Sequence, residues 1–299
     1  MQTCPSSFDI VHSIPEITSL RHAILYLVLA LTQSIASAAQ TQTDSATFGV
    51  VSQRSPTLTA QYWNPILRYV ADKSGVPLAL KLARTGPEHT AMISRGEPEF
   101  IYSNHNFTPD NDPVGYRVIA RPAQAAITGQ IVVLEDSPIA ALAQLQGKEV
   151  VFPSRAAFVG YYVPMDAMLR LGLQVSPLFA GNQEGAIGQL KAGRAVAAAV
   201  NSEVMRDFAR REGLRYRALW TSDPYQNIPI SVHPRVPTQK ADAVGEAFAR
   251  MSEDPEGSRI LAACAELIKQ PPPFGFVRAT DSDYNNVRQF HRDTLVKGD

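Results

Sequence analysis

The sequence has little cysteine, no excess charge of either sign and no long apolar run beyond its N-terminal segment, and each absence excludes a class of protein. It has 2 cysteines. Cys4 precedes the apolar N-terminal segment, so Cys264 has no partner for an internal disulfide and is expected to be a buried, inert thiol. The 28 basic and 28 acidic residues cancel, and the lack of Lys and Arg clusters argues against nucleic-acid binding.

The N-terminal segment has the parts of an export signal. Arg21 and His22 precede the apolar run 23–31, which leads into the small residues 36–39, an order typical of a cleavable signal peptide. We expect residues 1–39 to be the signal peptide and the mature protein to be periplasmic. An uncleaved anchor is the alternative, although the run is shorter than the roughly 20 residues that span a bilayer.

The rest of the chain alternates between strand-like and helix-like segments, which is typical of α/β proteins with mostly parallel sheets. Residues 47–51 form an apolar strand, and Ser55 and Pro56 are suited to begin the helix that follows. The same order of strand and helix starts again near residue 134, and Pro164 must kink or shift the start of a helix expected there. Two blocks of one pattern predict two lobes.

We therefore predict an α/β fold of two lobes joined by two crossings of the chain. The first part of lobe 1 is expected at 44–133, lobe 2 at 134–222, and the return crossing with the second part of lobe 1 at 223–299. Two crossings form a hinge, about which the lobes close over a ligand through small changes in backbone torsion.

Polar turns that follow the strands supply the candidate ligand residues, because open α/β sheets bind ligands at the carboxyl ends of their strands. Ser154 and Arg155 precede a helix, whose free amides and dipole suit a small oxyanion, and an arginine binds such an anion through two hydrogen bonds. Alternatively, Ser154 only caps the helix and Arg155 is a solvated charge. The expected ligand residues are Gln53, Ser55, Tyr102, Asn104, His105, Ser154, Arg155, Ala156, Gln183, Asn201 and Tyr225.

Several of these residues have a second interpretation. A histidine in a loop is commonly a surface residue, but the position of His105 at the end of the strand 100–103 favours the cleft. Ser55 is equally suited to a simple helix cap. Tyr102 is expected in the core by alternation, and Tyr225 is suited to an aromatic wall of the pocket.

Several short segments follow one another along residues 47–270. They include Phe48-Gly49-Val50-Val51, Lys73-Ser74-Gly75-Val76-Pro77, Asp136-Ser137-Pro138-Ile139, Gly160-Tyr161-Tyr162-Val163-Pro164 and Gln189-Leu190-Lys191-Ala192-Gly193. In this order they resemble the periplasmic solute-binding proteins of phosphate, phosphite and phosphonate ABC transporters. The resemblance implies a type II periplasmic binding protein fold, a small oxyanion between the lobes and delivery to a permease. Some relatives instead report an oxyanion to a membrane sensor kinase, which is the alternative function.

The sequence departs from the family's pattern at two places. Relatives usually have Ser or Thr hydroxyls directly before the Gly-Tyr that matches 160–161, whereas residues 157–159 are Ala, Phe and Val. Relatives commonly have Ser-His-Asp near 181–184, where Gln183 cannot carry the charge of a protonated histidine. The first departure removes hydroxyl donors and favours a smaller, less charged or different oxyanion, and the second makes the site less cationic than the usual site of the family.

Catalysis is not expected. The sequence has no G-x-S-x-G elbow, H-E-x-x-H motif or phosphate-binding P-loop. His89, His105, His233 and His291 lack metal-ligand spacing, although folding could still assemble a zinc site. We predict a monomer that is not an enzyme and needs no metal or cofactor.

Overall fold

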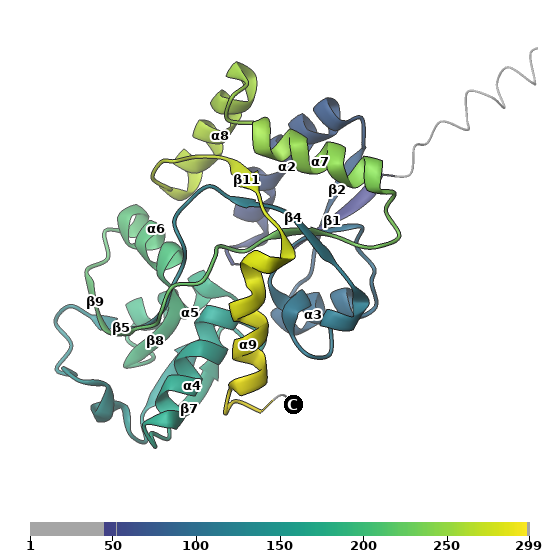
Figure 1. Cartoon of the computed structure of the whole chain (residues 1–299). Helices are drawn as coiled ribbons and strands as arrows, with labels where there is room; N and C mark the ends of the chain where they lie inside the picture. Colours follow the sequence, from purple (N-terminus) through teal and green to yellow (C-terminus); the bar gives the residue numbers. More distant parts are fainter. Residues whose placement is uncertain (1–44, 52, 298–299) are drawn as a thin grey trace, which may run out of the picture. The chain divides into compact units, whose positions relative to one another are not determined.

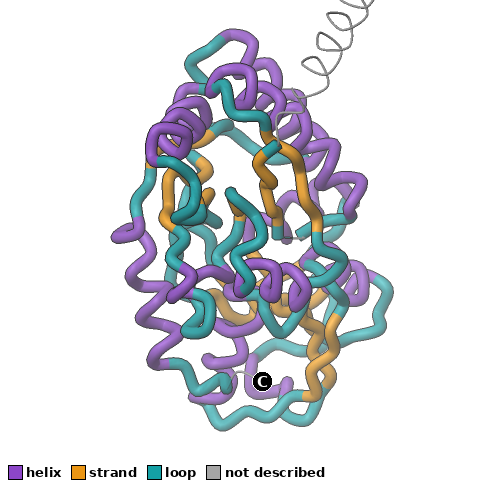
Figure 2. Tube along the Cα trace, turned by 90° about the vertical axis from the view of Figure 1, so that its right-hand side faces the viewer, coloured by secondary structure: helices purple, strands orange, loops and turns teal. Residues whose placement is uncertain are grey.

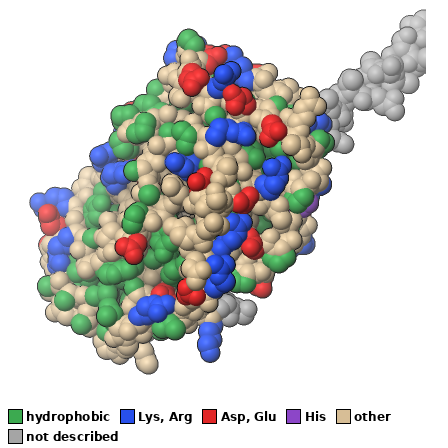
Figure 3. Space-filling model, in the orientation of Figure 1, with side chains coloured by type: hydrophobic (Ala, Val, Ile, Leu, Met, Phe, Trp, Pro, Cys, Tyr) green, Lys and Arg blue, Asp and Glu red, His purple; other side chains and the backbone are tan. Residues whose placement is uncertain are grey.

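The computed structural model describes residues 45–51 and 53–297, so the expected signal peptide at 1–39 lies outside the described residues. Two mixed sheets, each flanked by helices, form the framework (Figures 1 and 2). The described residues contain no helix with the length and apolar character needed to cross a membrane. On the face seen in Figure 3, basic and acidic side chains are interspersed, in keeping with the zero net charge.

Lobe 1 is the six-stranded sheet with its helices. Its strands have the order β11-β4-β10-β3-β1-β2, in which β1 is parallel to β2 and β3, while β10 and β11 are antiparallel to their neighbours. The strands are β1 Ala46–Val50, β2 Leu78–Leu82, β3 Phe100–Tyr102, β4 Arg117–Pro122, β10 Ile230–Val232 and β11 Phe276–Arg278. The helices are α2 Pro56–Ser74, α3 Gly86–Ser94, α7 Thr238–Arg250 and α8 Pro255–Ile268, with short turns η1 His105–Phe107, η2 Asp112–Val114 and η5 Asp281–Tyr284.

Lobe 2 is the five-stranded sheet with its helices. Its strands have the order β7-β6-β8-β5-β9, in which β6 is parallel to β7 and β8, and β5 is antiparallel to β8 and β9. The strands are β5 Gly129–Leu134, β6 Glu149–Phe152, β7 Ser176–Phe179, β8 Ala197–Asn201 and β9 Tyr216–Thr221. The helices are α4 Val163–Arg170, α5 Gln183–Lys191 and α6 Ser202–Glu212, with a 3-10 turn η3 at Leu142–Leu145 and a π turn η4 at Phe158–Tyr162.

Local sequence signals explain where the helices begin. Ser55 Oγ accepts a hydrogen bond from the amide of Leu58 at 3.3 Å and Pro56 is the first residue of α2, so the expected cap is confirmed. Pro164 lies in the first turn of α4, and the π turn η4 precedes it. The proline therefore shifts the start of the helix, as expected, because it lacks the amide proton that a helix interior needs.

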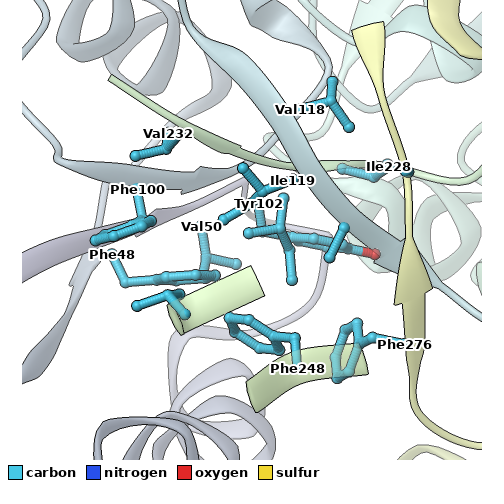
Figure 4. Close-up of a cluster of buried hydrophobic side chains, with 14 of the residues drawn as sticks. Phe48, Val50, Phe100, Tyr102, Val118, Ile119, Ile228, Val232, Phe248 and Phe276 are labelled. Carbon is cyan, nitrogen blue, oxygen red and sulfur yellow. The ribbon is translucent and has the colours of Figure 1, made fainter. Parts of the chain in front are cut away.

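Each lobe has its own apolar core. In lobe 1, side chains of β1, β3 and β10 pack against α7 and β11 (Figure 4), among them Phe48, Phe100 and Phe248. In lobe 2, both faces of the sheet are covered, one by η4 and α4 and the other by α5 and α6. The cores are joined at one place, because Phe158, Val159 and Val163 of lobe 2 belong to the same apolar cluster as the core of lobe 1.

Three segments of the chain join the two sheets. The crossings at 123–128 and 222–229 are hydrogen-bonded to each other, since Ile127 and Tyr225 exchange backbone hydrogen bonds of 2.7 and 2.8 Å. Because β5 begins at Gly129 and belongs to the second sheet, we propose that lobe 2 starts a few residues before the expected boundary at 134.

The third segment is α9, Asn285–Asp293, shown in yellow in Figure 1. It starts at lobe 1, where Tyr284 stacks on Phe107 at 5.1 Å. Beyond it, the Leu295 amide donates to Asp166 Oδ1 at 2.7 Å, and Val296 is buried in the core of lobe 2. We therefore propose that the C-terminal residues belong with lobe 2, because an acceptor and an apolar pocket there bind them, and not with the second part of lobe 1 expected at 223–299.

Candidate functional site

A small cavity of about 30 Å³ lies between the lobes. Strand ends, loops and helix heads of both lobes surround it, together with one residue of the return crossing. Among the described residues that line it, none is a Lys, Arg, Asp or Glu. The lining residues are Val51, Gln53, Gly86, Asn104, His105, Pro153, Ser154, Ala157, Phe158, Val159, Gly181, Asn182, Gln183, Asn201 and Ile228.

Helix α5 brings its N-terminus to the cavity. Asn182 caps the helix by accepting a hydrogen bond from the Gly185 amide at 2.8 Å. The Glu184 amide donates across the cleft to the backbone oxygen of Gln53 at 3.1 Å. The amides of Glu184 and Gly185 are therefore already paired, and α5 offers an anion mainly the positive potential of its N-terminal end.

The two lobes come into close contact at Gly86 and Ser154. A Cβ added at Gly86, the first residue of α3, would lie 2.5 Å from Ser154 Oγ, which is inside van der Waals contact. Ser154 is 8% exposed and lines the cavity. Position 86 therefore needs a glycine for the lobes to meet here.

Gln183 and Asn201 form the polar floor of lobe 2. Gln183 Oε1 accepts a hydrogen bond from the backbone amide of Asn201 at 2.9 Å. Asn201 Oδ1 caps α6 by accepting from the backbone amides of Glu203 and Val204 at 2.8 and 3.4 Å. Asn201 Nδ2 is buried and has no hydrogen-bond partner in the described part of the chain. Asn201 thus brings an unused amide donor to the cavity.

His105 belongs to the wall that lobe 1 contributes. The residue is 3% exposed, its Nδ1 lies 2.9 Å from Thr90 Oγ1, and its ring stands edge-on to His89 with centroids 5.3 Å apart. Burial lowers the pKa of His105 to about 4, and the charge of His291 adds to this effect. The imidazole is therefore neutral at neutral pH and offers no positive charge to a ligand.

The structure brings most of the predicted polar residues together. The predicted residues that lie together in the cavity are each at a strand end or helix head that faces the opposite lobe. The predicted residues that line the cavity are Gln53, Asn104, His105, Ser154, Gln183 and Asn201.

The remaining predicted residues lie outside this cavity. Arg155 is exposed and stacks over the Phe179 ring at 4.8 Å, because the turn that points Ser154 inward points its neighbour outward. Tyr102 packs in the core of lobe 1 and lines a second small cavity beside the first. Ser55 is an exposed helix cap, Ala156 is half-buried, and Tyr225 packs edge-on against Phe158 at 4.8 Å.

Residues 157–159, where the sequence lacks hydroxyls, line the cavity at the head of η4. The Phe158 ring packs against Tyr225, Phe290 and His291, with centroids 4.8 to 5.3 Å away. These three partners do not line the cavity, so the ring stabilises the wall from behind. Phe158 thereby connects lobe 2, the return crossing and α9.

Sequence reasoning missed the ionic contact between the lobes. Arg54 Nη2 lies 3.5 Å from Asp207 Oδ2, and Arg54 Nε lies 3.7 Å from Glu184 Oε1. Burial raises the pKa of Asp207 to about 6, although Arg54 and Arg206 lower it. Arg54 follows the predicted Gln53 directly. No local pattern in the sequence indicates that Arg54 would pair with Asp207, a carboxylate of α6 in the other lobe. Thr90, which holds His105, and Asn182 were also not predicted as site residues.

The described residues contain no group of three or more His, Cys, Asp or Glu placed to hold a metal ion. Cys264 is buried, and burial raises the pKa of its thiol to about 11, so the expected unreactive thiol agrees with its surroundings.

Comparison with protein families gives one match. The profile of the family described as "ABC transporter, phosphonate, periplasmic substrate-binding protein" matches residues 48–284. A search of curated protein sequences found no significant match.

Three solved structures with the same architecture illustrate the likeness. A binding-protein component of an ABC phosphonate transporter from Pseudomonas aeruginosa has a TM-score of 0.70 and 14% identity, covering 82% of this chain and 85% of its own. PhnD1 from Prochlorococcus marinus in complex with methylphosphonate has a TM-score of 0.69 and 11% identity, covering 84% and 98%. A Xanthomonas citri protein bound to chloride has a TM-score of 0.66 and 14% identity, covering 83% and 96%. These likenesses confirm the two-lobed fold of type II periplasmic binding proteins.

Proposed function

This chain belongs to the periplasmic substrate-binding proteins of phosphonate ABC transporters, and from this premise we propose that it captures a small phosphorus oxyanion between its lobes and delivers it to a membrane permease. The family consists of transport receptors and not of enzymes. The family match gives no support to the alternative of signalling to a sensor kinase. A monomeric state remains our prediction.

The observation that carries the proposal is the composition of the interlobe cavity. The heads of α3, α5 and η4 meet there, and Asn201 Nδ2 is a buried donor without a partner among the described residues. Helix N-termini bind oxyanions through their amides and dipoles without cationic side chains. An oxyanion in this position satisfies the Asn201 donor, which is otherwise costly to bury.

The size and charge of the cavity support a small ligand. A volume of about 30 Å³ and a lining without charged residues favour phosphite or a short phosphonate over a large organic phosphonate. Ala157, Phe158 and Val159 line the cavity but have no hydroxyl donors. We therefore propose fewer hydrogen bonds to the ligand than the usual family pattern provides.

The variant Asn201→Asp tests the site. Aspartate keeps the oxygen that caps α6 but replaces the free donor Nδ2 with a carboxylate oxygen, which repels an anion. Thermal denaturation with phosphite, methylphosphonate, phosphate and sulfate should show stabilisation of the unsubstituted mature protein by at least one of them, by about 2.7 kcal/mol at 100 times the dissociation constant. This stabilisation should disappear in Asn201→Asp.

Ser55→Ala is the matched control, because Ser55 caps a helix outside the cavity. It should lower the midpoint slightly and leave the ligand-induced shift unchanged. A flat response of the unsubstituted protein to every oxyanion would contradict the proposed function, and an unchanged response in Asn201→Asp would place the ligand elsewhere.

A further inference from the structure

The cavity has a single titratable side chain. Among the described residues that line it, none is Asp, Glu, Lys, Arg, Tyr or Cys, and His105 is its only histidine. The main chain of His105 is fixed by hydrogen bonds from its amide to Ser103 Oγ at 3.0 Å and from Asn111 Nδ2 to its carbonyl at 2.9 Å. The proton on this ring therefore decides which hydrogen bonds the cavity offers to an acidic ligand.

Thr90 determines which nitrogen of His105 carries that proton. The Thr90 hydroxyl lies 3.1 Å from the backbone oxygen of Gly86, one turn earlier in α3, and 2.9 Å from His105 Nδ1. A helical threonine commonly donates to the carbonyl one turn before it, and a hydroxyl has one proton to donate. Thr90 Oγ1 therefore accepts from the Nδ1–H of His105, and Nε2 keeps its lone pair.

Nε2 of His105 is then an acceptor in need of a donor. The hydrogen bonds of His105 in the described part of the chain use its backbone and Nδ1, which leaves Nε2 without a partner there. The ring is neutral at neutral pH, because burial lowers its pKa to about 4. Asn201 Nδ2 is the complementary group, a buried donor without an acceptor.

The elements packed against His105 supply no charge that would favour protonation of its ring. His89 of α3 has its pKa lowered by burial, and burial lowers the pKa of His291 of α9 to about 4. Arg288 of α9 is ion-paired with Asp112 of η2 at 2.8 Å. The other charged groups of these elements are Glu88 of α3 with Arg292 and Asp293 of α9.

We propose that the cleft selects oxyanions that keep one acidic hydrogen, such as the monoanions of phosphonates and of phosphite; this inference rests on the function proposed above. The P–OH group of the ligand donates to His105 Nε2, and Asn201 Nδ2 donates to an unprotonated oxygen. A fully ionised oxyanion of similar size places an oxygen lone pair against that of Nε2. His105 thus determines specificity for the protonated ligand, and Thr90 positions its proton.

Methylphosphonate is the test ligand, because it loses its second proton in the neutral range. Two probes of related shape accompany it: its monomethyl ester, a monoanion without an acidic hydrogen, and sulfate, a dianion. Isothermal titration calorimetry on the mature protein between pH ~6 and pH ~9 should show the affinity for methylphosphonate falling about tenfold for each pH unit above the second pKa of the ligand. At pH ~6 the ester and sulfate should bind at least about tenfold more weakly.

Substitutions distinguish an effect of His105 on the pH dependence of binding from a general effect of ligand charge. His105→Gln offers an amide that accepts or donates, so it should bind both ionisation states and flatten the pH profile. Thr90→Val removes the oxygen that holds Nδ1–H and should flatten it as well, whereas Thr90→Ser should restore the slope. Arg155→Ala, outside the cavity, should keep the full pH dependence.

An affinity for methylphosphonate that is constant or rises with pH, or equal binding of sulfate, overturns the inference and leaves the proposed function standing. Failure of every probe and of phosphite at every pH overturns both. The ¹⁵N chemical shifts of His105 in the protein without ligand give an independent measurement. They should indicate the Nδ1–H form, and an Nε2–H form would contradict the inference.

Discussion

The ion pairs of Arg54 with lobe 2 should contribute most to stability at alkaline pH, and the variant Arg54→Met tests this. Arg54 lies 3.5 Å from Asp207, whose side chain is 1% exposed. At an effective dielectric constant of about 20, a pair at this distance is worth roughly 5 kcal/mol before desolvation, and the lost hydration of both groups offsets most of it. Because Arg206 and Arg211 still pair with the two acceptors of Arg54, we expect a net loss of about 2 kcal/mol in the free energy of unfolding at pH ~8.

The pH dependence of this loss follows from Asp207. Burial raises its pKa from 3.8 to about 6, against the opposing charge of Arg54. A carboxyl group with a raised folded-state pKa favours folding when protonated, so its contribution to stability increases as the pH falls from about 6 toward 3.8. Removing Arg54 raises this pKa further. The variant should therefore lose stability mainly above pH ~6 and approach the unsubstituted protein near pH ~5.

Urea denaturation at pH ~5 and pH ~8 measures both parts of the prediction. Asp207→Asn and the double variant complete a cycle, in which the double variant should recover more than half of the loss at pH ~8. An equal loss at both pH values, or no coupling between the two substitutions, would refute the reasoning, because an arginine that acts only through packing of its stem gives a loss that does not depend on pH.

Three further predictions concern contacts around the cleft. Gly86→Ala should weaken methylphosphonate binding by about tenfold in calorimetry, because its Cβ meets Ser154 Oγ at 2.5 Å, and adding Ser154→Gly should restore it; no recovery would contradict a steric cause. Asp166→Ala should lower the free energy of unfolding by about 2 kcal/mol and speed hydrogen exchange at Leu295, whose amide it binds at 2.7 Å; unchanged exchange would mean that the C-terminus is held without it. Arg155→Ala should leave ligand binding unchanged and lower stability by less than about 1 kcal/mol; weaker binding would return Arg155 to the site.

The sequence predicted those structural elements that depend on residues within a few positions of one another. Ser55 and Pro56 begin α2 as predicted, because a cap and a first-turn proline act within one turn of the chain. The two blocks of strand and helix likewise predicted two lobes, since each block has the apolar residues for its own sheet. Residues 139–145 show the limit of such signals, because Ile139, Leu142 and Leu145 have the spacing of an apolar helix face but only the turn η3 forms there.

Long-range contacts decided what the sequence did not predict. Ser154 and Arg155 are neighbours in one turn, yet the first faces the cavity and the second stacks on Phe179, and no local pattern states which of two adjacent side chains turns inward. The missing hydroxyls around Phe158 were visible in the sequence. The sequence did not show that an aromatic cluster around Phe158 takes their place, because the other members of the cluster come from the return crossing and α9.

Arg54 and His105 have different roles at the cleft, and the difference has a measurable consequence. Arg54 bridges the lobes but does not line the cavity, whereas His105 lines the cavity and its hydrogen bonds among the described residues stay within lobe 1. A change in the fraction of closed molecules multiplies the dissociation constant of every cleft ligand by the same factor. Arg54→Met should therefore weaken methylphosphonate and phosphite equally, while His105→Gln should change the preference between protonated and ionised ligands. If Arg54→Met instead changed the ranking of ligands, its side chain would have to reach the bound anion, and the ionic contact would belong to recognition and not to closure.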